Sequence, residues 1–188
     1  IESLTINNSI HLIGEQKETT VIMWNYQFVI DVYADEVLVT GFTIYCFERS
    51  FGILLYGNES IVSGNIFENG SAGVLINSKN NLISHNQFHD SGVSLITTFN
   101  NNISFNTISG CNPAIGLWGL NTENTFYMNN ITGNVMGVIL EMSSRNTFLC
   151  NNFINNSKQA RFARGIPIEI LGKINLIFSH FNSNTFQL

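Results

Sequence analysis

Short apolar segments recur along the chain at intervals of 19 to 23 residues, in three patterns that keep the same order. The first pattern, Asn-x-apolar, begins at Asn65, Asn86, Asn106, Asn129 and Asn151. The second, small-apolar-x-apolar, begins at Gly52, Gly73, Gly92, Ala114 and Gly137. The third also places an apolar residue two positions after an asparagine, at Asn81, Asn101, Asn124, Asn146 and, later, Asn175. Three patterns that hold their order over successive periods indicate an internal repeat.

Each pattern is a short segment with an apolar residue at every second position, bounded by Asn, Gly or Ser. Such segments are typical of short strands joined by tight turns. Three such strands per repeat leave no room for a helix and exclude leucine-rich, ankyrin and other helical repeats. We therefore predict an all-β fold, a right-handed single-stranded parallel β-helix, as one domain over residues 1–188.

Stacking one coil on the next sets the backbones about 4.8 Å apart and aligns equivalent side chains. The asparagines of the first pattern then form a ladder of hydrogen-bonded amides, as in stacked cross-β structures. The apolar positions of the second pattern form an inner stack of Ile53, Val74, Val93, Ile115 and Val138. We therefore interpret nearly every asparagine as structural.

These motifs resemble a known group of repeat proteins. From Ser9 to Phe153 the chain is similar to the parallel β-helix proteins of the NosD and carbohydrate-binding/sugar-hydrolase group. The stretches that carry the resemblance are Ile10–Glu15, Thr20–Ile22, Val37–Ile44 and Asn151–Ala160. The resemblance implies the fold but leaves the function open, because this scaffold carries lyases, hydrolases, adhesins and copper-site accessory proteins.

The repeat is interrupted near the carboxyl end of the sequence. Asn184, the next plausible ladder position, lies 33 residues after Asn151, which implies an insertion. We predict a lateral loop or short helix over residues 158–173, before a last coil.

Composition narrows the class of protein. Only 11% of the residues are charged, the net charge is −5, and 28 asparagines supply much of the polar surface. This balance argues against a nucleic-acid partner, which would require a basic surface. No apolar run is long enough to span a membrane, and the three cysteines lack the spacing of a disulfide framework or a zinc site.

Catalytic carboxylates are sparse. Glu68 and His89 share a column of the aligned coils, and Asp90 follows His89, so these three are the candidate acid–base group. Glycoside hydrolysis needs two carboxylates within about 5–10 Å, and this group lacks an arginine or a second aligned acid. The sequence therefore favours a non-catalytic role over an enzyme.

The resemblance also raises a copper site, for which thiolate, thioether and imidazole are the preferred ligands. Aligning the coils on the first asparagine pattern puts one column at Gly64, His85, Phe105, Met128 and Cys150. Met128 and Cys150 are neighbours there, but Phe105 separates them from His85, so one ion cannot bind all three. We interpret the column as a semi-buried packing stack and expect no resident metal or cofactor. Met128 and Cys150 are the candidate ligands for the alternative in which copper binds.

The outward positions of the second pattern hold more apolar residues than a sheet face exposed to solvent normally does. Their two columns are Leu54, Leu75, Ser94, Gly116, Ile139 and Tyr56, Asn77, Ile96, Trp118, Glu141. Such a strip predicts contact with the terminal excursion, another domain or a second chain. Alternatively, it forms a sugar-stacking face with Tyr56, Asn77, Trp118 and Glu141 as binding residues.

Six asparagines satisfy the Asn-x-Ser/Thr acceptor pattern for glycosylation, which matters only in an exported protein. They are Asn7, Asn58, Asn69, Asn102, Asn130 and Asn155.

The leading functional hypothesis is an extracellular, cell-surface or periplasmic module with an architectural or adhesive role, for which glycans are a candidate partner. A carbohydrate-active enzyme and a periplasmic copper-site accessory protein are the alternatives. The first residues are already strand-like and the last ones are apolar, so we expect neighbouring domains or copies of the chain to cover the two ends.

Overall fold

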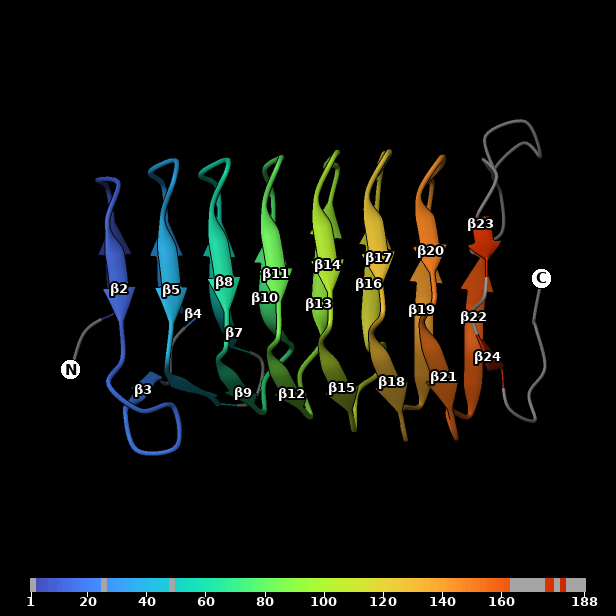
Figure 1. The fold of residues 1–188 in the computed structure, drawn as a ribbon, viewed down its shortest axis with the longest axis horizontal. Helices are drawn as coiled ribbons and strands as arrows, with labels where there is room; N and C mark the ends of the chain where they lie inside the picture. The colour runs from blue at the N-terminus through green and yellow to red at the C-terminus, as the bar shows by residue number, and fades with distance from the viewer. Residues whose placement is uncertain (1–2, 25–26, 48–49, 163–174, 178–179, 182–188) are drawn as a thin grey trace.

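The computed structural model describes residues 3–24, 27–47, 50–162, 175–177 and 180–181. These residues form coils stacked along the long axis of the molecule (Figure 1), and the strands make three parallel sheets of eight. Sheet A contains β1 (Leu4–Ile6), β4 (Phe28–Val32), β7 (Phe51–Leu55), β10 (Ala72–Ile76), β13 (Val93–Ile96), β16 (Ile115–Trp118), β19 (Met136–Leu140) and β22 (Lys158–Phe162). Sheet B contains β2 (His11–Ile13), β5 (Leu38–Thr40), β8 (Ile61–Ser63), β11 (Leu82–Ser84), β14 (Asn102–Ser104), β17 (Thr125–Tyr127), β20 (Thr147–Leu149) and β23 (Asn175–Ile177). Sheet C contains β3 (Val21–Trp24), β6 (Thr43–Cys46), β9 (Ile66–Glu68), β12 (Gln87–His89), β15 (Thr107–Ser109), β18 (Asn130–Thr132), β21 (Asn152–Ile154) and β24 (His180–Phe181).

The chain passes through sheets A, B and C in turn and then begins the next coil. This arrangement confirms the predicted parallel β-helix. The described residues contain no helix, and so none that is long and apolar enough to cross a membrane.

The predicted amide ladder lies at the turn between sheets B and C. In its middle, Asn86 donates two hydrogen bonds to Oδ1 of Asn106, from its backbone N–H at 3.0 Å and from Nδ2 at 3.1 Å. Asn106 makes the same two bonds to Oδ1 of Asn129, both at 3.0 Å. Each Nδ2 also donates to a strand carbonyl, as Asn106 does to Ile83 at 2.8 Å. Each buried amide therefore satisfies backbone groups that the tight turn leaves without a sheet partner.

Two further ladders occupy the other turns. The third sequence pattern, from Asn81 to Asn146, forms a ladder at the turn between sheets A and B, with side-chain contacts of 3.0 Å. At the turn between sheets C and A, the Asn134 amide donates to Asn156 at 2.8 Å and accepts from the backbone N–H of Cys111 at 2.9 Å. This third ladder was not predicted from the sequence, although Asn134 and Asn156 are also one period apart.

Inward-facing side chains fill the space between the three sheets. The predicted stack from Ile53 to Val138 is buried as expected. On sheet C the rings of Phe67 and Phe88 stack at 4.7 Å, and on sheet B those of Phe126 and Phe148 stack at 4.4 Å. Such a pair contributes about 0.5–1.5 kcal/mol beyond its buried area.

The structure changes the reading of the carboxyl-terminal part in two places. The first five residues of the expected excursion, Lys158–Phe162, form β22 and pair with β19, so they are the last strand of sheet A and no excursion. In β23 the backbone of Asn175 pairs with Thr147, one position away from the asparagine alignment. Residues 163–174 and Asn184 lie outside the described residues.

The outward columns of sheet A have the predicted register, but the expected apolar strip is only partly exposed, because Tyr56 and Ile96 are 42% and 38% exposed whereas the other column is largely buried. Leu54 is 3% exposed and Ile139 is 7% exposed. Gly116 lies under the indole of Trp118, because a Cβ added there would be 2.5 Å from Nε1. Alternation along the strand therefore does not reveal which outward side chains solvent reaches.

Candidate functional site

The column that contains Met128 and Cys150 forms a ridge at the turn between sheets B and C. We call its residues His85, Phe105, Met128 and Cys150 the B–C ridge. All four have left-handed backbone angles, with φ between 51° and 57°, directly before a ladder asparagine. This conformation turns the chain sharply and directs the side chains away from the core. The backbone N–H of Met128 bonds to the carbonyl of Leu149, which places Met128 beside Cys150.

The order of side chains along the B–C ridge is as predicted, but the ridge is more open than a semi-buried stack. The rings of His85 and Phe105 stack at 5.0 Å. Met128 is 45% exposed, and Cys150 is partly exposed. Phe105 therefore keeps His85 apart from the two sulfur-bearing residues.

The remaining thiols do not fit a copper site. Cys46 and Cys111 are buried, and burial raises the pKa of each thiol to about 12, with a further contribution from the Asp90 carboxylate at Cys111. The thiolate is the form that binds metals, so these two side chains are poor ligands. Within the described ranges, no three His, Cys, Asp or Glu side chains come together as a metal-binding group. The soft donors that do fit are Met128 and Cys150 on adjacent coils.

The candidate acid–base residues lie on the outer face of sheet C. The backbones of Glu68 and His89 pair directly, as predicted, and His89 pairs with Ser109 on its other side. Nδ1 of His89 lies 3.3 Å from Oγ of Ser109. Asp90 is exposed on the following turn with φ of 54°, and its carboxylate lies against Gly110. The partner of His89 is thus the hydroxyl group of Ser109. The only ion pair among the described residues is Arg145–Glu123, at 3.4 Å, and it does not involve the candidate acid–base group.

The four candidate sugar-binding residues share one outward column of sheet A but do not form one site. Tyr56 stacks on Tyr33 at 5.1 Å, and Asn77 lies on the next coil. Trp118 ends β16 and Glu141 directly follows β19, the sixth and seventh strands of the sheet. The column from Tyr56 to Glu141 therefore spans about 19 Å at the usual strand spacing. The indole of Trp118 covers its own sheet rather than facing solvent as a platform.

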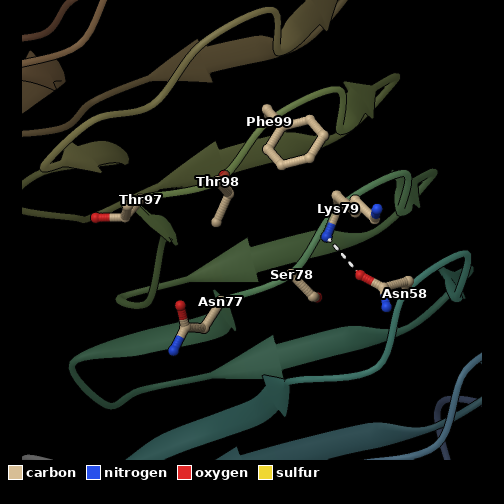
Figure 2. Close-up of a pocket in the computed structure, with 7 residues that line it drawn as sticks. All are labelled: Asn58, Asn77, Ser78, Lys79, Thr97, Thr98 and Phe99. Carbon is tan, nitrogen blue, oxygen red and sulfur yellow. Dashed lines mark hydrogen bonds between the residues drawn. The ribbon is translucent and has the colours of Figure 1, made fainter.

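A shallow cleft lies beside this column, at the turn between sheets A and B (Figure 2). Its volume is about 240 Å³ and its lining residues are Asn58, Asn77, Ser78, Lys79, Thr97, Thr98 and Phe99. Two of them were predicted from the sequence to have a role, Asn77 as a sugar ligand and Asn58 as a glycosylation acceptor. The cleft brings these two together with a lysine and an exposed aromatic ring, and no single pattern in the sequence joins them.

One carboxyl group is unusually placed in sheet A. Asp31 occupies the outward column between Thr5 and Leu54. Its Oδ1 is buried without a hydrogen-bond partner, and burial raises the pKa of this carboxyl above its usual value of 3.8. The uncompensated oxygen destabilises the charged form of the group.

The six acceptor asparagines differ in accessibility. Three are exposed, namely Asn7, Asn102 and Asn155, and the other three are half-buried. Nδ2 of Asn58, the nitrogen that a glycan would occupy, donates to Asp35 at 3.1 Å. Glycosylation of these residues stays a prediction.

The fold and the described surface together define a class of protein, a parallel β-solenoid of short coils with amide ladders at its corners. Comparison with protein families then identifies the group. Residues 2–169 match the family described as periplasmic copper-binding protein (NosD), and the chain belongs to this family. Neither curated proteins nor solved structures gave a significant match.

Proposed function

We propose that this chain is a non-catalytic periplasmic module that handles copper and holds copper(I) as cargo between Met128 and Cys150. The observation that carries the proposal is that these two soft donors lie side by side on the exposed B–C ridge of a member of the NosD family. The periplasm is the proposed location within the broader extracytoplasmic setting that the family supports.

The donor types support copper(I) rather than a harder ion. Thiolate and thioether sulfur favour copper(I), whereas calcium and magnesium prefer oxygen ligands. A pair of donors on an open ridge leaves the ion accessible from solvent, which suits transfer to a partner better than permanent storage. Bound copper would supply no chemistry to this chain beyond its own transport.

The test is competition for copper(I) against a chromogenic chelator under anaerobic conditions. We expect one ion per chain, with affinity reduced at least about tenfold by Cys150→Ser or Met128→Leu, since loss of a ligand or its support typically costs 10–100-fold. Met142→Leu is the matched control, because Met142 is also an exposed methionine with left-handed backbone, φ 53°, at a different corner.

The copper proposal fails if Met142→Leu and Met128→Leu lower the affinity equally. It also fails if the wild-type chain binds copper(I) no more tightly than Cys150→Ser does. Unfolding curves of all variants, measured without copper, separate lost ligands from lost structure.

An architectural or adhesive role in the cell envelope is the second candidate, with neighbouring domains or copies of the chain as partners. The observation that favours it is the rigidity of the scaffold, because amide ladders occupy all three turns and satisfy buried backbone groups. Failure of the copper test would leave this role as the better supported one.

A further inference from the structure

The cleft at the turn between sheets A and B exists because successive turns differ in length. Four residues separate Ile76 from the ladder residue Asn81, whereas five separate Leu95 from Asn101. The ladder keeps its register across this step, since the backbone N–H of Asn81 donates to Oδ1 of Asn101 at 2.9 Å. The additional residue must therefore be accommodated outward, and Thr97 takes a left-handed conformation there with φ of 52°. The step between the shorter and longer turns leaves the hollow that Figure 2 shows.

Some polar groups of the cleft are already committed to the fold. Oγ of Ser78 donates to the carbonyl of Leu55 at 3.0 Å and accepts from the Asn81 amide at 2.9 Å. Oγ1 of Thr98 donates to Oδ1 of Asn121 at 3.1 Å. These hydroxyls form the floor of the cleft and are not free to donate to a ligand.

Other groups in the same cleft are unused. Asn77 and Thr97 are exposed, and their side chains make no hydrogen bond within the part of the chain that the structure describes. The free amide of Asn77 offers both donors and an acceptor to a ligand rich in hydroxyl groups. The Thr97 hydroxyl is turned away from Lys79 and Phe99 and lies against Gly119 of the next coil. Figure 2 shows that Asn77 and Thr97 come from neighbouring coils, so their spacing is set by the stacked backbone.

The cleft also contains a cation and an apolar surface. The Nζ atom of Lys79 lies 5.4 Å from the centroid of the Phe99 ring. The ring attracts the ammonium group and holds it at the cleft. Lys79 forms no ion pair with a carboxylate of the described residues, and the Phe99 ring remains 47% exposed.

We infer that this cleft binds one ring of a carboxylate-bearing sugar, a uronic acid unit of a polysaccharide. Lys79 pairs with the carboxylate, the Asn77 amide bonds to ring hydroxyls, and the exposed part of Phe99 contacts the C–H face. The volume of about 240 Å³ lies below the range of about 300–1,000 Å³ of pockets for drug-sized ligands, so it suits one ring.

Recognition of a peptide strand is less favoured at this place. A strand ligand is held by unpaired backbone groups at a sheet edge, whereas β10 and β13 each have strands paired on both sides. The available contacts are therefore side-chain groups, in the mixture that suits a sugar. This site is independent of the copper proposal, because the B–C ridge lies at a different corner of the coil.

Binding is tested by titrating the isotope-labelled chain, with a metal chelator present, with trigalacturonate and following backbone amide resonances by NMR. We expect shifts centred on Asn77, Thr97 and Phe99, and weaker binding of the neutral sugar cellotriose. Lys79→Met should weaken trigalacturonate binding about two- to fivefold, as expected for an exposed ion pair. Asn77→Ala should weaken it about two- to tenfold, as for one lost hydrogen bond.

Two controls define the outcome. Lys158→Met removes an exposed lysine from β22, far along the solenoid, and should leave the affinity unchanged. The inference is overturned if trigalacturonate produces no shifts at the cleft, if both lysine variants change the affinity equally, or if cellotriose binds as tightly. It is also overturned if acetate alone binds as tightly as trigalacturonate, because the sugar ring would then contribute nothing.

Discussion

Replacing Asn106 by leucine removes the central amide of the ladder at the turn between sheets B and C. Asn106 is 1% exposed, so no solvent reaches the groups that it serves. The backbone N–H of Asn86 loses its acceptor, and the carbonyl of Ile83 loses the bond from Nδ2. The Asn86 amide keeps its bond to Val62. Each buried group left without a partner costs about 1–3 kcal/mol, so the loss of these two bonds should lower the free energy of unfolding by about 2–6 kcal/mol.

Equilibrium unfolding in urea, followed by far-ultraviolet circular dichroism, measures this loss. A stacked array can unfold in more than one step, so the first transition of each variant should be compared. Asn102→Leu is the matched control, because Asn102 belongs to the same coil but is exposed on β14. If Asn106→Leu unfolds at the same urea concentration as Asn102→Leu, the ladder does not stabilise the fold as argued.

Two further predictions concern the ionisable groups. Native protein at pH 8 should react with iodoacetamide at Cys150 only, among the three thiols, because burial raises the pKa of Cys46 and Cys111 to about 12. Mass spectrometry should then find one modified thiol in the native chain and three after denaturation, and rapid modification of either buried thiol would contradict the structure. The raised pKa of Asp31 means that the folded state holds a proton more tightly than the unfolded state, so stability falls as pH rises from 3.8 through the folded pKa. Asp31→Asn should lose less stability over this range in thermal melts at successive pH values, whereas a pH profile identical to wild type would refute the assignment.

The repeat in the sequence was sufficient to predict the fold, the ladder register and the columns. Asn65 to Asn151 recur at nearly constant spacing, and each coil must present the same surface to the next because parallel strands pair in register. For the same reason the pairing of Glu68 with His89, and the position of Phe105 between His85 and Met128, followed from alignment alone. The shift of β23 could not be predicted, because the inserted stretch before it removes the constant spacing.

Alternation along a strand determined which side chains face outward, but it did not determine which of them solvent reaches. Leu54 and Ile139 face outward and are nevertheless only 3% and 7% exposed, which the alternation along a single strand does not show. The cleft likewise depends on tertiary structure. The sequence contains the unequal turn lengths, but only stacking shows that Ser78 is committed to the fold while Asn77 and Lys79 remain available. The sequence by itself thus determined the periodic backbone, because the recurring pattern of each coil is visible along the chain. The surface was decided by the tertiary structure, because it depends on contacts between coils about twenty residues apart.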